Sequence, residues 1–358
     1  MDYFVYIGTY TGSGSEGIYG YRFDAITGNF KRIGLAAEAE NPSFLAVHPN
    51  GKFLYAVNEI ADFKGQSSGS VSAFAIDPDS GELKLVGKTA SLGAMPAYIS
   101  LDQRGRYALV ANYQGGSVAV FPLAESGDLL APSAFVDHSE ASRKAGSQKS
   151  SHAHAIRVSK DNQFAIAADL GLDQLLVYRF DEARGLLSPH QPAAAELKPG
   201  AGPRHLSFHP NGKWLYVANE LDSSVTAFSY QAEAGSLHDL ETMSTLPGSF
   251  AGGNSPGEIL VDQKGRFLYV SNRGHDSIAV FAIDSGTGRL TAIEQVPTGG
   301  RTPRNFALDP TGNWVFAANQ DSNQVVLLAL DQERGRLTPS LNTLEVSSPV
   351  CVAFAPAF

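Results

Sequence analysis

The chain alternates short apolar runs with turn residues, and this pattern predicts β-strands throughout. Runs such as 53–57 and 267–271 are rich in aromatic and β-branched residues and have the length of strands. Because they are almost continuously apolar, we expect both of their faces to be covered by other strands. No segment of useful length carries a helical period. The chain is therefore predicted to be all-β.

The strands recur in units of one kind. A unit starts near a proline (a histidine in one case), runs as an apolar strand, turns, and returns as a second strand that ends in Asn or Asp. The turns contain Asn-Gly or related pairs, which supply the positive φ that tight hairpins need. A third strand follows, for example at 70–74 and 277–281. Six such units occupy residues 42–58, 96–112, 152–169, 203–219, 256–272 and 303–319.

A short glycine phrase recurs seven times, with its glycines roughly 50 residues apart, a period typical of radial β-repeats. It consists of a small or turn residue, Gly, any residue, and Leu or Phe, and a fourth strand is expected after it. Four antiparallel strands per unit make the blade of a propeller. The glycines are Gly28, Gly81, Gly127, Gly185, Gly235, Gly288 and Gly335.

The two ends of the chain complete the pattern. Residues 3–9 match the second strand of a blade that has no first strand, and residues 348–354 match a first strand that has no second. Pairing of these two strands closes the ring and removes its exposed edges. We therefore predict a seven-bladed β-propeller of four-stranded antiparallel blades, forming a single domain over residues 1–358.

Composition narrows the possible partners. The formal net charge of −9 disfavours a nucleic acid or an anionic membrane as partner. No apolar run of about 18 residues exists, so no membrane span is expected. The N-terminus lacks the pattern of an export signal, and the only cysteine, Cys351, precludes an internal disulfide, so we expect a cytoplasmic protein. We interpret Cys351 as a core residue rather than a nucleophile.

Two connections, 60–69 and 137–151, are longer than the others. The second is polar and rich in Ser and Lys, without a strand pattern. Long connections of this kind are usually functional or disordered. Segment 137–151 is therefore either a surface loop or a lid.

Polar residues gather where the chemistry of a propeller is expected. The start of a first strand and the end of a second strand share one mouth of the ring, so aligning the units on their internal turns shows what surrounds it. Strand starts should be small or apolar if they only fill space, but here they are charged or polar. The aligned candidates are His154, Arg204 and Arg304, then His205, Glu258 and Asn305, and, after the terminal Asn, Glu220 and Arg273.

Three arginines beside two carboxylates and imidazoles indicate an anion-binding site with an acid–base group. Two alternative interpretations give these residues a structural role only. In one, Arg204 and Glu220 form a buried ion pair that fills the channel; in the other, His154 is a core histidine. The pair His152 and His154 permits a metal site, but spacing fixes no third ligand, so we expect no metal and no cofactor. We interpret His48 and His209 as turn residues and the terminal asparagines as turn caps.

Several phrases resemble the seven-bladed propeller lactonase family, whose activities include 6-phosphogluconolactonase and, in a fungal branch, carboxy-muconate cyclase. The resemblance covers essentially the whole chain and is most specific between His152 and Asn305. It implies that the family's active-site positions fall on His154, Arg204, Glu220 and Arg273. The phrases are Ser-His-Ala-His at 151–154, Gly-Pro-Arg-His at 202–205, His-Pro-Asn-Gly-Lys at 209–213, Asn-Glu-Leu at 219–221, Ser-Asn-Arg-Gly at 271–274 and Pro-Arg-Asn-Phe at 303–306.

The resemblance leads to a hypothesis: the chain is a carboxylic ester hydrolase that converts 6-phospho-D-glucono-1,5-lactone to 6-phosphogluconate in the pentose phosphate pathway. Glu220 or His154 would deprotonate water, with Glu220 preferred, and an arginine would stabilise the oxyanion. Arg304, Arg273 or the loop residues Arg143, Lys144 and Lys149 would hold the phosphate. The expected substrate-binding residues are Arg304, His205, Asn305, His152 and Glu258.

Other functions stay open on the sequence. A carboxy-muconate lactonising enzyme or cyclase would also need arginines and an acid for its polyanionic substrate. A metal-dependent sugar lactonase would need a cage of carboxylates and asparagines, and a non-catalytic interaction propeller would carry a large external patch instead. The expected partner is a small anionic sugar lactone, and the protein is expected to be a monomer or weak dimer.

Overall fold

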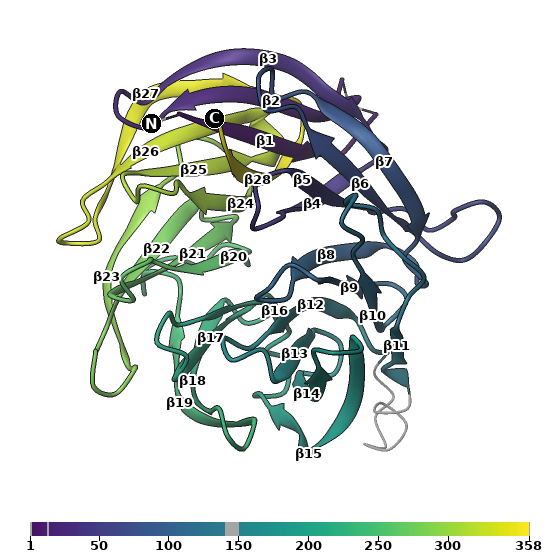
Figure 1. Cartoon of the computed structure of the whole chain (residues 1–358). Coiled ribbons are helices and arrows are strands. Elements are labelled where there is room, and N and C mark those ends of the chain that lie inside the picture. Colours follow the sequence, from purple (N-terminus) through teal and green to yellow (C-terminus); the bar gives the residue numbers. More distant parts are fainter. Residues whose placement is uncertain (1, 13, 140–149, 358) are drawn as a thin grey trace.

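The computed structural model describes residues 2–12, 14–139 and 150–357, and their strands form seven four-stranded antiparallel sheets. The sheets are arranged as blades around a central channel, with one strand of each blade at the centre (Figure 1). The predicted all-β, seven-bladed propeller is confirmed. Among the described residues, no helix has the length and apolar character needed to cross a membrane.

Within each blade the strands follow one another in sequence order from the channel outward. The exception is the blade that closes the ring, where the C-terminal strand is innermost. That blade contains β28 (Pro349–Pro356), β1 (Asp2–Thr9), β2 (Gly17–Asp24) and β3 (Asn29–Glu38). The next three contain β4 (Pro42–Val47), β5 (Phe53–Asn58), β6 (Ser70–Ile76) and β7 (Leu83–Ala90); β8 (Pro96–Leu101), β9 (Tyr107–Asn112), β10 (Ser117–Pro122) and β11 (Ala134–Asp137); and β12 (Ala153–Val158), β13 (Phe164–Asp169), β14 (Gln174–Asp181) and β15 (Leu186–Glu196).

The last three blades complete the ring. They contain β16 (Pro203–Phe208), β17 (Trp214–Asn219), β18 (Ser224–Gln231) and β19 (Ser236–Ser244); β20 (Ser255–Val261), β21 (Phe267–Arg273), β22 (Ser277–Ile283) and β23 (Leu290–Pro297); and β24 (Pro303–Leu308), β25 (Trp314–Asn319), β26 (Gln324–Leu330) and β27 (Leu337–Glu345). A single 3₁₀ turn, η1 (Gln320–Ser322), follows β25.

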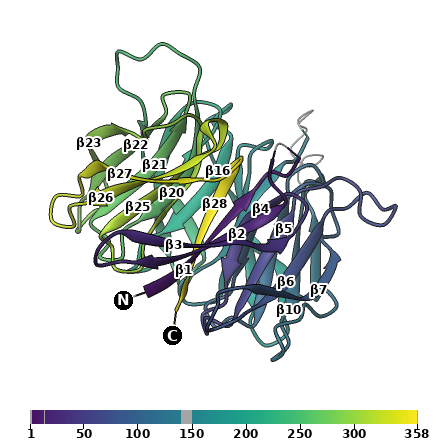
Figure 2. The same cartoon turned by 90° about the horizontal axis from the view of Figure 1, so that it is seen from above.

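The ends of the chain pair as predicted. β1 runs antiparallel to β28, from Tyr3 opposite Pro356 to Thr9 opposite Pro349. The first and last strands therefore lie in the same blade, and the view from above also shows them close together (Figure 2). This pairing gives β1 a hydrogen-bonded partner on each side, β28 and β2, so both ends of the chain contribute to one complete blade and the ring is closed.

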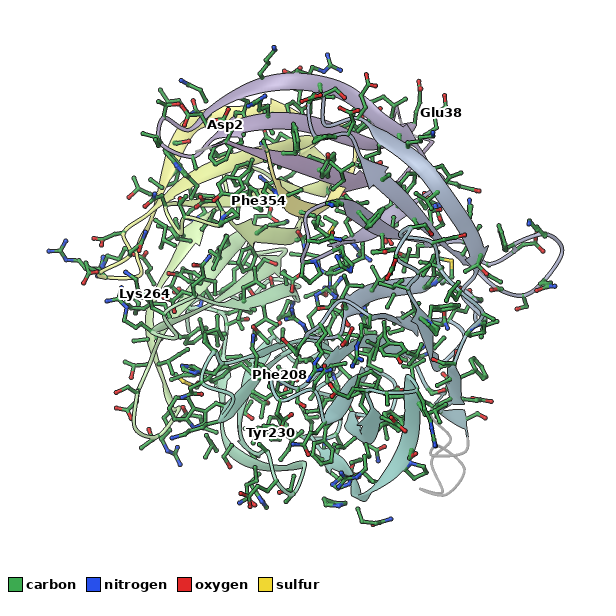
Figure 3. The ribbon with its side chains drawn as sticks, viewed as in Figure 1. Asp2, Glu38, Phe208, Tyr230, Lys264 and Phe354 are labelled. Carbon is green, nitrogen blue, oxygen red and sulfur yellow. The ribbon has the colours of Figure 1, made fainter. Side chains whose placement is uncertain are left out.

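Burial follows the position of a strand within its blade. All six residues of β13 and of β17 are buried, whereas the outermost strand β15 has no buried residue. The second strands are covered on both faces by neighbouring blades, which explains their continuous apolar runs. Side chains fill the space within and between blades (Figure 3). Phe208 of β16 and Tyr230 of β18 pack on one another within a blade, with ring centroids 5.4 Å apart, and Phe23 of β2 packs on Phe316 of β25, in another blade, at 4.9 Å.

Tyrosines on three of the second strands connect their blade to the glycine turn of the next. The hydroxyl groups of Tyr6, Tyr216 and Tyr269 donate hydrogen bonds to the carbonyl oxygens of Gly81, Gly288 and Gly335, at 2.9, 2.9 and 3.1 Å. The glycines adopt positive φ of 76°, 73° and 71°, which side chains rarely allow. The recurring glycine phrase therefore marks a contact between blades as well as a turn.

We expect Tyr216→Phe to lower the free energy of unfolding by about 1 kcal/mol, because it leaves the buried carbonyl of Gly288 without its donor. Denaturant unfolding of the purified variant measures the change. Tyr55→Phe is the matched control, since the Tyr55 hydroxyl is buried without a hydrogen-bond partner in the described part of the chain. Equal losses in the two variants would contradict the role assigned to the Tyr216 hydrogen bond.

The structure confirms part of what the sequence predicted for the turns and loops. His48 and His209 are turn residues, as expected: each Nδ1 accepts from the backbone two residues later, at Asn50 and Asn211. The outer strand of the third blade begins only at Ala134, because Leu129 forms just an isolated bridge. Most of segment 137–151, with Arg143, Lys144 and Lys149, lies outside the described residues, so its interpretation as loop or lid stays a prediction.

Candidate active site

The candidate residues lie at the end of the channel where the inner strands begin, which we call the first mouth. Strand pairing explains why: Pro203 at the start of β16 lies opposite Asn219 at the end of β17, and Ser255 at the start of β20 lies opposite Arg273. Arg204, Glu220 and Arg273 are therefore held at the same rim of the ring by two neighbouring blades.

A β-bulge at the start of the inner strands sets the direction of these side chains. The pairing of β12, β16 and β24 with its neighbour skips one residue near the first mouth, and the skipped residues are His154, Arg204 and Arg304. Bulges re-aim a side chain and occur often beside active sites. Three of the predicted residues are thus positioned by the same local irregularity.

Glu220 joins two arginines from different strands. Its Oε2 lies 2.8 Å from Arg204 Nε and 2.7 Å from Arg273 Nη2. Arg273 is held in place by donating from Nε to the carbonyl of Ser255 and from Nη2 to that of Pro256, both at 3.1 Å. The side chains of Arg204, Arg273 and Glu220 are 3%, 12% and 21% exposed, so Glu220 faces the opening most.

The charges of Arg204 and Arg273 determine the protonation state of Glu220. Burial by itself would raise the pKa of Glu220, but the Arg204 and Arg273 guanidiniums outweigh it and hold the pKa below its usual value. Burial, with the neighbouring Arg273 and Arg304 charges, lowers the pKa of Arg204 to about 9. At neutral pH Glu220 is therefore a carboxylate and all three arginines are charged.

Arg304 belongs to a second part of the first mouth. Its guanidinium lies over the ring of Tyr10, 5.2 Å from the centroid, and the Tyr10 hydroxyl donates to Glu59 Oε2 at 2.9 Å. Tyr10 and Glu59 were not among the predicted site residues. Tyr10 follows Thr9, the last residue of a second strand, and so occupies in the first blade the position that Glu220 and Arg273 occupy in theirs. Extending the alignment to that blade would have found it.

His154, in β12, and His152, just before β12 begins, both contact the ring of Tyr113. His154 is buried, with its ring 5.4 Å from that of Tyr113 and 5.1 Å from that of His205, and its Nδ1 has no hydrogen-bond partner among the described residues. Burial and the Arg204 charge lower the pKa of His154 well below its usual value, so the ring is neutral. His152 stacks on Tyr113 at 4.8 Å and binds Ser150 Oγ through Nε2 at 2.9 Å.

No third ligand joins the two histidines. Within residues 2–12, 14–139 and 150–357, no group of three or more His, Cys, Asp or Glu side chains is arranged to hold a metal ion. The His152–His154 metal site that the sequence permits therefore lacks a protein cage there. Cys351 is buried, as expected of a core residue, and burial raises the pKa of its thiol.

Three predicted substrate-binding residues form a buried chain behind Arg204. Arg204 Nη1 lies 3.2 Å from His205 Nε2, His205 Nδ1 lies 3.0 Å from Glu258 Oε1, and Asn305 Nδ2 donates to Glu258 Oε2 at 2.6 Å. His205, Glu258 and Asn305 are only 2%, 4% and 3% exposed. We call these four residues the support chain, because they lie behind the arginine rather than at the opening.

Hydrogen-bond directions in the support chain are fixed by its two ends. Arg204 can only donate, so His205 Nε2 accepts and its Nδ1–H donates to Glu258. At the other end, the backbone N–H of Val352 donates to Asn305 Oδ1, which turns the amide N–H₂ toward Glu258. Burial raises the pKa of Glu258 to about 7. Glu258 is therefore a group of the support chain that titrates near neutral pH.

The Arg204–Glu220 ion pair that a channel-filling role requires is present, but it does not account for the whole arrangement. Three guanidiniums share the first mouth with the carboxylates of Glu220 and Glu59. A pair that only filled space would not need the third arginine. The surplus of fixed, planar donors is what an anionic ligand needs.

Comparison with known proteins relates the chain to lactonases. A family described as lactonase, 7-bladed beta-propeller matches residues 4–354. A 6-phosphogluconolactonase of Bacillus subtilis is 38% identical over 83% of this chain and 82% of its own length, and one of Formosa agariphila is 34% identical over 82% and 83%. A periplasmic gluconolactonase of Pseudomonas aeruginosa has a similar structure, with a TM-score of 0.90 and 36% identity over 100% of both chains.

Proposed function

The chain belongs to the seven-bladed β-propeller lactonase family, and from this premise we propose that it hydrolyses 6-phospho-D-glucono-1,5-lactone to 6-phosphogluconate. The observation that carries the proposal is the cluster of Arg204, Arg273 and Arg304 around the partly exposed carboxylate of Glu220. Such a cluster suits a substrate with a phosphate group and a carbonyl oxygen that becomes negative during the reaction.

In the proposed reaction, water adds to the C1 carbonyl carbon of the lactone. A general base takes one proton of that water, and the carbonyl oxygen becomes an oxyanion beside Arg204 and Arg273. The bond from C1 to the ring oxygen then breaks, and the departing alcohol oxygen takes a proton. Arg304, stacked over Tyr10, binds the phosphate. The lactone is a reactive ester, so this scheme requires no covalent nucleophile.

Glu220 is the proposed base. Both arginines contact its Oε2, and its side chain is 21% exposed, so we assign its other oxygen, Oε1, to a water in the opening. His154 has an unpaired Nδ1, but it is buried, and a proton on it would lie among three guanidiniums. The low pKa of Glu220 makes it a weak base, which a reactive lactone tolerates.

The proposal is tested by mixing the purified protein with freshly generated 6-phosphogluconolactone and, separately, with unphosphorylated gluconolactone. Ring opening is followed above the spontaneous rate, with and without a chelator. Preference for the phosphorylated lactone supports the proposal. Equal or greater use of gluconolactone would favour the activity named for the Pseudomonas relative, and no acceleration of either would overturn a lactonase function.

We expect Arg304→Gln to raise KM for the phosphorylated lactone by about 10- to 100-fold, the loss typical of a charge-assisted contact. The unphosphorylated lactone should be affected much less, because it has no group for Arg304 to bind. Steady-state kinetics on both lactones measure the difference. Arg301→Gln removes the same charge from an exposed position three residues away and should change neither KM. Equal effects on the two lactones would exclude Arg304 as the phosphate ligand.

The support chain predicts a pH dependence. Glu258 becomes protonated as the pH falls through about 7, and it then loses the charge that holds His205 and, through it, Arg204. We therefore expect kcat/KM to decline on the acid side of pH 7. His205 and His154 do not produce this decline, since burial and then the Arg204 charge hold their pKa values well below the usual one.

Glu258→Gln should be less active at all pH values and should lack that decline, because glutamine cannot titrate and its amide would meet the amide of Asn305 donor to donor. The pH profile separates a positioning role from a purely structural one, which would lower activity without altering the profile. An unchanged acid limb in the variant would show that another group titrates.

A further inference from the structure

The other end of the channel, where the inner strands end, holds a second cavity. We call this end the second mouth. Its cavity has a volume of about 530 Å³, a size typical of small-molecule sites. Arg157 and Lys160 line it and also line an adjoining space of about 240 Å³, together with Gln103 and Gln263. Two cations thus lie where the two spaces meet.

Aromatic rings separate the two mouths. Phe44 of β4, Tyr98 of β8 and His205 of β16 meet across the channel, with centroid distances of 4.2 Å between Phe44 and Tyr98 and 4.9 Å between Tyr98 and His205. Phe44 and Tyr98 line the cavity of the second mouth, whereas Arg204 and Glu220 do not. A ligand in this cavity would therefore lie on the other side of these rings from Arg204 and Glu220, and it would meet the support chain only at Glu258 and Asn305, which also line the cavity.

The two cations have unused hydrogen-bonding capacity. The only hydrogen bond of the Arg157 guanidinium to a described residue is the weak one from Nη1 to the carbonyl of Leu206, at 3.4 Å. Neither Arg157 nor Lys160 forms an ion pair within the described residues. Burial, followed by the charge of Arg157, lowers the pKa of Lys160, as expected of two cations that share a recess.

The carboxylates of the second mouth accept hydrogen bonds from other groups: Asp102 and Glu258 through both oxygens, and Asp262 through one. Asp102 Oδ1 accepts from the backbone N–H groups of Arg106 and Tyr107, and its Oδ2 accepts from the N–H of Arg104 and from Asn162 Nδ2. Glu258 accepts through both oxygens within the support chain, and Asp262 Oδ1 accepts from two backbone N–H groups of its own turn.

What the second mouth offers to a ligand is therefore mainly donors: a guanidinium, with five N–H groups, and an ammonium, with three. We propose that this cavity binds the phosphate or carboxylate group of a small metabolite between Arg157 and Lys160. A bound oxyanion would use the free donors and relieve the repulsion between the two cations. This second anion site does not depend on the proposed lactonase substrate.

Calorimetric titration tests the proposal, with inorganic phosphate and citrate as separate probes. The wild-type protein should bind one more equivalent of at least one probe than Arg157→Gln does, or should bind it about 10- to 100-fold more tightly at that site. Lys160→Gln, a change at an exposed residue, should weaken the same site. Binding of phosphate alone would identify a phosphate-bearing ligand, and binding of citrate alone a carboxylate.

Arg184→Gln is the matched control, because it removes the same charge from a side chain that is 77% exposed on the outer rim. Arg157→Gln should keep the wild-type melting temperature. Its lactone hydrolysis should also be kept when assayed well above pH 7, where Glu258 stays ionised even without the Arg157 charge that lowers its pKa, and this shows that the first mouth is intact. Identical stoichiometry and affinity for both probes in wild type, Arg157→Gln and Lys160→Gln would overturn the second site, whatever the activity assay shows for the first mouth.

Discussion

Replacing Glu220 with glutamine is expected to lower kcat for the lactone by about 10²- to 10⁴-fold, the range associated with loss of a general base. Glutamine keeps the size of the side chain, and its amide oxygen can keep the place of Oε2 beside Arg204 Nε and Arg273 Nη2. What the variant loses is the ability to take a proton from water. We therefore expect kcat to fall more than KM rises, as measured above the spontaneous rate of ring opening.

Glu59→Gln is the control for this variant. Glu59 is a carboxylate of the same mouth, but its described partner is the hydroxyl of Tyr10 rather than an arginine. The Glu59→Gln variant should therefore lose far less activity than Glu220→Gln. An unaltered kcat in Glu220→Gln would exclude Glu220 as the base. His154→Gln would then become the decisive variant, since His154 Nδ1 is the other unpaired acceptor near the arginines.

The architecture was predictable because every unit repeats the same short sequence patterns, which act on local structure. Turn glycines, internal Asn-Gly turns and apolar second strands each recur at the same place in the unit, so the blades could be counted without knowing their contacts. The pairing of β1 with β28 followed from two unmatched half-units and is confirmed. The Tyr216–Gly288 hydrogen bond was not predictable, since it joins residues 72 positions apart through a side chain.

The sequence predicted which residues gather at the first mouth, but not which of them lie at the opening and which lie behind it. Aligning strand starts and strand ends brought Arg204, Glu220 and Arg273 together, and the structure places them in contact. The same alignment could not tell that His205 and Glu258 lie behind Arg204. Adjacent strand residues point in different directions, and the bulges that shift this alternation at β16 and β24 have no signature in the spacing alone. The roles of all these residues stay predictions.

The second mouth was missed for a related reason. Arg157 lies in the latter half of β12, at a strand position that the alignment did not compare between blades. Its charge is informative only because no described carboxylate pairs with it, whereas Asp102 and Glu258 are engaged elsewhere. A sequence shows which residues are charged, but not which charges are already balanced by a partner.

Arg273→Ala is expected to lower kcat/KM by about 10²- to 10³-fold, the loss typical of removing one donor to an oxyanion. Arg273 is suited to that role because the carbonyls of Ser255 and Pro256 fix its guanidinium, so it need not reorganise as charge develops. Arg273→Lys keeps a cation but not this planar, doubly anchored geometry, and it should recover only part of the loss. Normal kcat/KM in Arg273→Ala would exclude Arg273 from both oxyanion and phosphate binding.

The same variant should also shift the pH profile, and this separates electrostatics from simple loss of structure. Arg273 is one of the two guanidiniums that hold the pKa of Glu220 below its usual value against the opposing effect of burial. Without it, the pKa of Glu220 must rise. The acid limb that reports protonation of Glu220 lies at lower pH than the decline assigned to Glu258, so it is read in the Glu258→Gln background, where it moves to higher pH. Arg301→Gln, at an exposed residue that is not among the arginines lowering the pKa of Glu220, should leave that limb in place. Because a misfolded variant would lose activity at every pH without moving the limb, an unshifted profile in Arg273→Ala would show that Glu220 is not the group whose protonation stops the reaction.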